Sequence, residues 1–147
     1  MKIDETNFDI IRELKQGKKS FKRIADKLFI TENTVRSRVN RLQQEGVLEI
    51  CGLVDPGMLP GHRVVIIGMN LSEMNLVEKG EEISRCKGVI SVSVVTGRYD
   101  LLVTVLFKKG FGLLEFYTEE ISKVPGVKNV ETFVVYKSYN LKVPYVF

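Results

Sequence analysis

The sequence from residue 62 onward alternates between strand-like and helix-like hydrophobic patterns, and this order is what most limits the fold. Apolar residues form short β-rich runs in some segments and recur every three or four residues in others. The expected strands cover 64–69, 89–96, 101–107 and 130–136, and the expected helices cover 72–86 and 111–123. The predicted order is therefore β-α-β-β-α-β.

This order predicts a ferredoxin-like domain, built from two βαβ halves with helices on one face of the sheet. A weak internal repeat agrees, since Lys87-Gly88-Val89-x-x-Val92 recurs as Pro125-Gly126-Val127-x-x-Val130, with Val89 and Val127 38 residues apart. The helix residues expected to face the sheet are Leu76, Gly80, Ile83, Leu114, Tyr117 and Ile121.

Two of the expected strands are apolar on both faces. A sheet that carries helices on one face only would place a polar residue at every second position of each strand. The runs 64–67 (VVII) and 101–107 (LLVTVLF) do not alternate in this way. A second copy of the same sheet would cover the other face, so the sequence predicts a homodimer.

Residues 1–46 contain three short helical patterns. They begin after Asp4, Ser20 and Thr31, whose side chains suit the N-cap position, and Gly46 ends the third. Only the corner 28–30 separates the second helix from the third, which is typical of a helix-turn-helix. The apolar residues are Ile3, Phe8, Ile11 and Leu14 in the first helix, Phe21, Ile24, Ala25 and Leu28 in the second, and Val35, Val39 and Leu42 in the third.

The outward face of the third helix predicts the function of this module. With Val35, Val39 and Leu42 buried, a step of about 100° per residue turns amide, hydroxyl and guanidinium groups outward. Asparagine suits adenine edges in the major groove, arginine suits guanine, and the remaining groups suit phosphates. Within this third helix, the only acid before Glu45 is Glu32, in the first turn. The candidate DNA-binding residues are Lys19, Thr31, Asn33, Thr34, Arg36, Ser37, Arg38, Asn40 and Arg41.

The charge distribution agrees with a DNA-binding module. The net charge is +4, and between Lys15 and Arg41 nine bases stand against two acids. Residues 51–147 balance, with eleven bases and ten acids. The basic stretch is thus confined to the first module, as expected if that module meets phosphates. The alternative is a three-helix module whose basic face is merely solvated or contacts protein.

We therefore expect an α+β chain of two domains. A winged-type helix-turn-helix domain would cover 1–46, a β-strand linker 47–61, the βαββαβ domain 62–138 and a tail 139–147. The linker includes the β-rich run VLEICGLV and the turn signal Asp55-Pro56-Gly57.

Several classes of protein are not expected. No apolar run approaches the roughly 20 residues of a membrane span, and 1–7 does not resemble a signal peptide. Cys51 and Cys86 fit no C-x-x-C pattern, and we expect them to be reduced, as in a cytoplasmic protein. His62 is the only histidine, which argues against a metal site. No catalytic constellation is recognisable, so neither a cofactor nor an enzyme activity is expected.

The segment Thr96-Gly97-Arg98-Tyr99-Asp100 lies between two expected strands and has two interpretations. It is a hairpin turn, with Gly97 at an unusual φ and Asp100 bonded to nearby backbone. Alternatively it binds a small ligand, with Asp100 accepting an ammonium and amides near Gly97 holding a carboxylate.

In order and spacing, these segments resemble the leucine-responsive and asparagine-operon regulators, the Lrp/AsnC family, over nearly the whole chain. The resemblance implies DNA-binding dimers, often assembled into tetramers or octamers, and a small effector, commonly an amino acid, near Gly97, Arg98, Tyr99 and Asp100, with Thr132 as a weaker candidate. The matching segments are ITENTVRSRVNRL (30–42), EGVL (45–48), VDP (54–56), VTGRYDLL (95–102) and VPGV (124–127).

The departures from the family's pattern include two residues of the helix-turn-helix domain. Asn7 stands where the family usually has Asp, and Phe29 stands where it usually has Gly in the helix-turn-helix corner. Because a residue with a side chain is strained at positive φ, we expect this corner to be rebuilt.

Two other functions compete with that of a sequence-specific transcription regulator. Sirohaem decarboxylases look similar in architecture, but they depend on His and aromatic residues around a tetrapyrrole, and this chain has one His and no Trp. A DNA-compacting protein with little sequence preference is the other alternative.

Overall fold

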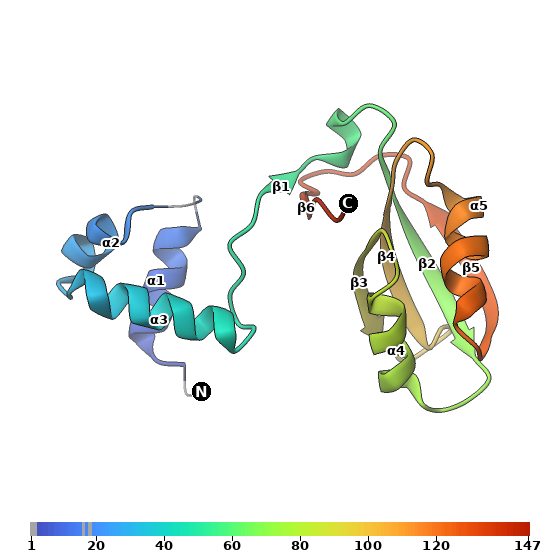
Figure 1. Ribbon diagram of the computed structural model, residues 1–147, viewed down its shortest axis with the longest axis horizontal. Coiled ribbons are helices and arrows are strands. Elements are labelled where there is room, and N and C mark those ends of the chain that lie inside the picture. The colour runs from blue at the N-terminus through green and yellow to red at the C-terminus, as the bar shows by residue number, and fades with distance from the viewer. Residues whose placement is uncertain (1–2, 16, 18) are drawn as a thin grey trace. The chain divides into compact units, whose positions relative to one another are not determined.

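The computed structural model describes residues 3–15, 17 and 19–147. The chain forms two compact units, Met1–Cys51 and Gly52–Phe147 (Figure 1). Within the described residues, every helix is too short or too polar to cross a membrane.

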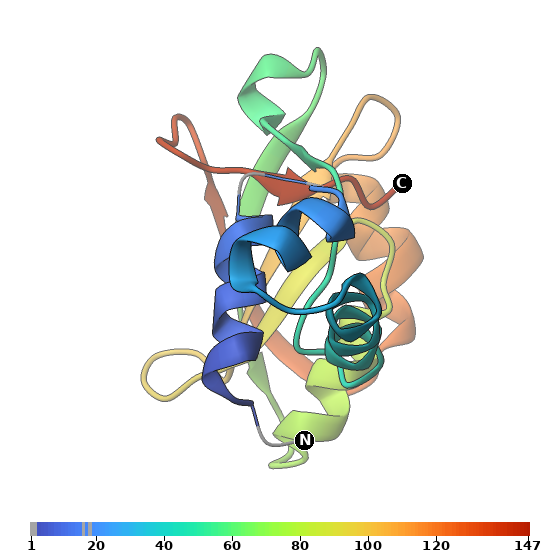
Figure 2. The ribbon, with the colours of Figure 1, turned by 90° about the vertical axis from the view of Figure 1, so that its left-hand side faces the viewer.

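The N-terminal unit is a bundle of three helices (Figure 1). Figure 2 shows the third of them, drawn in teal, nearly end-on. At each helix start the predicted cap is confirmed, since the side chains of Asp4, Ser20 and Thr31 each accept a backbone N–H from three residues on. The helices are α1 (Glu5–Leu14), α2 (Phe21–Leu28) and α3 (Glu32–Gln44).

The core of this unit matches the sequence prediction for α2 and α3 but not for α1. Val35, Val39 and Leu42 of α3 are fully buried, as is Ile24 of α2. In α1, however, Ile10 is the fully buried residue and Asn7 is buried beside it, whereas Phe8 is 46% exposed. The inward face of α1 therefore begins with a polar side chain, which the search for apolar spacing could not identify.

The corner between α2 and α3 is not rebuilt. Phe29 itself takes the left-handed conformation, with φ 56° and ψ 40°, and its backbone N–H closes α2 on the Ala25 carbonyl. Its side chain is 95% exposed, so no packing offsets the strain. The expectation of a different corner is therefore wrong, and the backbone keeps a conformation that favours glycine.

The C-terminal unit has the predicted βαββαβ order. Its four-stranded sheet has the strand order β3-β4-β2-β5, and all neighbouring strands are antiparallel. This is the ferredoxin-like arrangement. The elements are β2 (Arg63–Leu71), α4 (Leu76–Ser84), β3 (Val89–Val94), β4 (Leu101–Phe107), α5 (Leu113–Glu115), which continues as a π-helical turn (Phe116–Glu120) and a 3-10 turn (Ile121–Lys123), and β5 (Val127–Val134).

Several boundaries differ from the prediction, and the largest differences involve pairing between distant segments. The Ser72 N–H donates to the Gly126 carbonyl (2.8 Å), so α4 begins only at Leu76 rather than at residue 72. The end of β2, just before Ser72, pairs with the start of β5 through Leu71 and Val127, so β5 starts at Val127 rather than at 130. Of the expected linker strand 47–54, only β1 (Leu53–Val54) forms, and it pairs with β6 (Val143–Pro144) in the tail.

The second helical segment turns a different residue toward the sheet. Leu114 was expected to face inward, but it is 70% exposed, and Phe116 is fully buried in its place. The turn after Phe116 is wide, because the Ile121 N–H bonds to the Phe116 carbonyl five residues earlier. A spacing of five therefore brings Phe116 and Ile121 onto one face.

The two faces of the sheet are covered differently. The helix face forms the main core, in which Ile67, Val103 and Phe116 are among the buried residues. On the other face, the tail residue Val143 packs against Val64 and Leu106 at one end. Ile66 and Phe133, which are partners across β2 and β5, remain 36% and 42% exposed on the rest of that face.

The left-handed Phe29 yields a stability prediction. Phe29→Gly should stabilise the N-terminal unit by about 1 kcal/mol, because glycine adopts this conformation without steric cost. Hydrogen exchange of the α2 and α3 amides in the full chain under increasing urea would measure it. Phe29→Ala is the matched control, since it removes the ring but keeps the strain. Equal gains in both variants would contradict the argument from φ.

Candidate nucleic-acid interface and ligand sites

The exposed face of α3 is continuous and polar. Asn33, Ser37, Asn40 and Arg41 are all exposed, opposite the buried apolar residues of the same helix. Two adjoining hollows of about 530 and 600 Å³ follow this face, and Asn33, Ser37 and Arg41 line both of them. The surface thus offers amide, hydroxyl and guanidinium donors along one side of a single helix.

The two exposed arginines of α3, Arg36 and Arg41, are held by neighbours in the same unit. The Arg36 guanidinium lies 2.7 Å from Glu32, one turn earlier, and 5.2 Å from the centre of the Phe21 ring. Arg41 lies 3.9 Å from Glu45. Both arginine side chains are more than half exposed, so these contacts orient the guanidinium groups without enclosing them.

Arg38 has a different environment from the other predicted DNA-binding residues. Its Nη1 donates to both carboxylate oxygens of Asp4 (2.7 and 2.8 Å) and to the Asn7 side-chain oxygen (3.0 Å). The guanidinium hydrogen bond holds the pKa of Asp4 below its usual value. Arg38 therefore joins α3 to the start of α1. Its place beside Val35 and Leu42, at the edge of the buried face, is the sequence signal for this role.

Three further predicted residues are engaged within the unit. The Lys19 ammonium lies 3.1 Å from Glu13, which also accepts a bond from Lys27, and these two bonds lower the pKa of Glu13. Thr31 caps α3 by accepting the Thr34 N–H (3.1 Å), and the two hydroxyls are 2.8 Å apart. Lys19 thus holds the segment before α2 to α1, and the two threonines hold the start of α3.

The segment 97–100 is a tightly hydrogen-bonded turn. Gly97 has φ +127°, a conformation that side chains rarely allow. The Leu71 N–H donates to a carboxylate oxygen of Asp100 (2.8 Å), and the Asp100 N–H donates to the Met69 carbonyl (2.9 Å). The Asn70 amide also donates to the Arg98 carbonyl (2.9 Å). The hairpin interpretation accounts for all of these contacts, so the geometry of the turn does not by itself require a ligand.

Tyr99 lies over the sheet face that carries no helices. Its ring occupies the space above Gly68, where an added Cβ would come within 2.7 Å of ring carbons. The Tyr99 hydroxyl donates to Glu131, and burial together with this bond raises the pKa of Tyr99. Arg98 pairs with the same carboxylate at 2.9 Å, and Phe133 meets the Tyr99 ring edge-on.

The Thr132 side chain does not face this turn. Its hydroxyl is hydrogen-bonded to the Tyr117 hydroxyl (3.0 Å), on the face that the helices cover. Its neighbour Glu131 faces the turn instead, because Glu131 is the partner of Gly68 across the sheet. Sequence reasoning missed Glu131, and only the strand register, combined with side-chain alternation, identifies it.

His62 lies at the end of the sheet away from this turn. Its Nδ1 donates to the Pro60 carbonyl (3.0 Å), and its ring lies 5.8 Å from that of Tyr145. Across residues 3–15, 17 and 19–147, no group of three or more His, Cys, Asp or Glu side chains is arranged to hold a metal ion.

Two protein-family models match the chain. The model described as the Lrp/AsnC ligand binding domain matches residues 64–143, and the one described as winged helix-turn-helix DNA-binding matches residues 3–49. An uncharacterised HTH-type transcriptional regulator of Pyrococcus horikoshii is 30% identical over 137 residues, which cover 92% of this chain and 87% of the relative.

Solved structures have the same fold. The E. coli AsnC structure superposes with a TM-score of 0.71 at 18% identity, covering 96% of this chain and 97% of that one. A Neisseria meningitidis transcriptional regulator, solved in complex with L-Met, gives a TM-score of 0.70 at 17% identity, covering 99% of this chain and 96% of that one. Both likenesses are of fold.

Proposed function

The chain belongs to the Lrp/AsnC family of helix-turn-helix transcriptional regulators, and we propose that it recognises its operator by placing α3 in the major groove of double-stranded DNA. The observation that carries this proposal is the exposed face of α3, where amides and arginines stand opposite a fully apolar buried face. The sirohaem decarboxylase alternative is set aside, because the matching families and relatives are regulators of transcription and not enzymes.

The predicted DNA-binding residues divide into two roles in this proposal. Asn33, Asn40, Arg36 and Arg41 are exposed and suit base edges or phosphates, and Ser37 suits a phosphate. Thr31, Thr34 and Arg38 hold α3 in place through the bonds that they make within the unit. Lys19 holds the start of α2 to α1 through its bond to Glu13.

Substitution on the exposed face of α3 tests this division. Asn40→Ala and Arg41→Ala should each weaken operator binding by roughly 1–3 kcal/mol if the side chain contacts a base, and the loss of a phosphate contact should reduce the salt slope by about one unit. Operator affinity measured by fluorescence anisotropy at several salt concentrations gives both quantities. The helical content of each variant should equal that of the wild type.

Gln43→Ala is the matched control, because Gln43 is exposed on the flank of the same helix. Equal losses in all three variants, or none in Asn40→Ala and Arg41→Ala, would contradict the assignment. Footprints on random and selected DNA address the architectural alternative, which predicts the same affinity for both.

The second part of the proposal is a homodimer formed through the open sheet face of the C-terminal unit, with tetramers or octamers built from it. What supports it is the partly exposed apolar pair Ile66 and Phe133, which lies on the sheet face that carries no helices. A two-fold dimer also presents two copies of α3 to two half-sites.

A charge on the open face should separate the copies. Ile66→Glu should weaken dimerisation at least ~100-fold, because the carboxylate would be buried without a partner. Sedimentation of the full chain measures this, with circular dichroism to verify folding. Val77→Glu on α4 is the control, since Val77 is exposed outside the sheet. A folded Ile66→Glu variant that remains a dimer would show that the copies meet elsewhere.

The third part is an amino-acid effector bound at the turn Gly97–Asp100. The matching family model is a ligand-binding domain, and the relative from Neisseria was solved with L-Met. Asp100 supplies a carboxylate for an ammonium, and the backbone of the turn supplies amides for a carboxylate. Arg98, Tyr99 and Glu131 would border the ligand on the open face.

Asp100→Asn should reduce amino-acid binding more than tenfold, because the ammonium loses its carboxylate. Asparagine can still accept the Leu71 N–H, so the turn should keep its shape. Calorimetry with the twenty amino acids identifies the ligand in the wild type and measures the loss. Asp55→Asn is the control, because this carboxylate lies outside the turn and pairs with Lys142. Undiminished binding by Asp100→Asn would mean that the segment is only a turn.

A further inference from the structure

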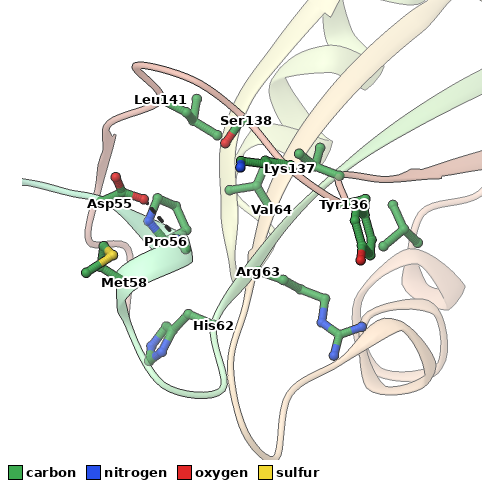
Figure 3. Close-up of a pocket in the computed structure, with 13 residues that line it drawn as sticks. Asp55, Pro56, Met58, His62, Arg63, Val64, Tyr136, Lys137, Ser138 and Leu141 are labelled. Carbon is green, nitrogen blue, oxygen red and sulfur yellow. Dashed lines mark hydrogen bonds between the residues drawn. The ribbon is translucent and has the colours of Figure 1, made fainter.

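A cavity lies at the end of β2 opposite the turn Gly97–Asp100. It encloses about 520 Å³ where the 3-10 turn Pro56–Met58 meets the start of β2, the end of β5 and the segment 136–141 (Figure 3). This volume is in the range of small-molecule sites. Its lining includes Asp55, Pro56, Val64, Lys137, Ser138 and Leu141.

The cavity carries uncompensated positive charge. Its one acid, Asp55, is already paired with Lys142 (2.8 Å) and accepts the Gly57 N–H (3.0 Å), and the Lys142 bond lowers the pKa of Asp55. Lys137 and Arg63 also line the cavity, and neither forms an ion pair with any residue that the structure describes. An anion in the cavity would therefore find cations, and a second cation would find no free carboxylate.

The side chains divide the cavity into a polar corner and an apolar wall. Figure 3 shows the Lys137 ammonium and the Ser138 hydroxyl close together above Val64 and Pro56, with Leu141 beside them. The Arg63 guanidinium extends the other way, below Tyr136. One ammonium and one hydroxyl next to aliphatic side chains suit a carboxylate with an apolar body. Arg63 points away from this polar corner in Figure 3 and adds positive potential to the cavity.

We propose that this cavity binds a small organic monocarboxylate. The carboxylate bonds to the Lys137 ammonium and the Ser138 hydroxyl, and the apolar body packs on Pro56, Val64 and Leu141. The site is separate from the turn Gly97–Asp100, which adjoins the far end of β2 through the bond from Asp100 to Met69. The proposal therefore does not depend on the effector function proposed for that turn.

Occupancy would act on the connection to the N-terminal unit. The 3-10 turn that forms one wall directly follows β1, and the segment that forms another leads into β6. These two short strands pair only through Leu53–Val54 and Val143–Pro144. A ligand that bridges both walls would stabilise this pairing, because it binds only when the walls are in place. The β1–β6 amides should then exchange more slowly with solvent.

The experiment titrates hexanoate and benzoate into the full-length protein by calorimetry, with hexan-1-ol and inorganic phosphate as comparison probes. Saturable binding of at least one carboxylate is expected, more than tenfold tighter than hexan-1-ol, because the alcohol lacks the charge. Phosphate should bind more weakly than the carboxylate, because it has no apolar body. Hydrogen exchange of the Leu53 and Val143 amides should slow when the carboxylate is bound.

Lys137→Gln should weaken carboxylate binding about tenfold or more, and Arg63→Gln should weaken it less. Lys128→Gln is the matched control, an exposed lysine of β5 outside the cavity, and Asp100→Asn should also bind normally. The proposal is overturned if neither carboxylate saturates, if phosphate binds as tightly as the carboxylate, or if Lys137→Gln binds like the wild type. Loss of binding in Asp100→Asn would also overturn it, since the carboxylate would then occupy the turn.

Discussion

β2 is hydrogen-bonded to a neighbour on each side, to β4 from Arg63 to Met69 and to β5 from Val65 to Leu71. A strand in this position has no free edge, so other elements can reach its side chains only from above and below the sheet. The helices cover Val65, Ile67 and Met69, while the tail covers Val64. Gly68 leaves room for the Tyr99 ring, and the turn at 97–100 is bonded to the strand's last residues. The two proposed ligand sites thus lie at the two ends of one central strand.

The arginines of α3 differ in how firmly they are held, and this difference decides what each is free to do. Arg36 and Arg41 each have one exposed acidic partner on their own helix. Exposed ion pairs of this kind contribute only about 0–1 kcal/mol, so exchanging the carboxylate for a phosphate costs little. Arg38 makes three bonds to two residues of the α1 region, and its release would also free the start of α1. We therefore expect Arg38 to orient α3 within the unit and not to contact DNA directly.

The parts of the fold that were predicted from sequence are those that local chemistry determines. The caps at Ser20 and Thr31, the buried face of α3 and the bounds of β4 depend on neighbours within a few residues. The late start of α4 depends on the bond between Ser72 and Gly126, which no local pattern contains. For β5 the internal repeat does predict the observed start, since Val127 corresponds to Val89, where β3 begins. The apolar run 130–136 predicted a start three residues later. The place of Glu131 beside the turn depends on the sheet register, which brings distant segments together. The cavity beside Pro56–Met58 likewise depends on the tail, which supplies part of its wall.

The open sheet face links two of the proposals that concern the C-terminal unit, the homodimer and the effector at the turn. Phe133 is the partner of Ile66 in the sheet and also packs edge-on against Tyr99. Arg98 and Tyr99 are both fixed by Glu131 on that face. A ligand at the turn would therefore contact the same side chains that border the surface through which two copies would meet. Ligand binding can shift assembly only if the assembled and separate states bind the ligand differently. Shared contacts of Tyr99 would provide that difference without any movement of the main core, because the Tyr99 ring lies on the outside of Gly68 and not within the core.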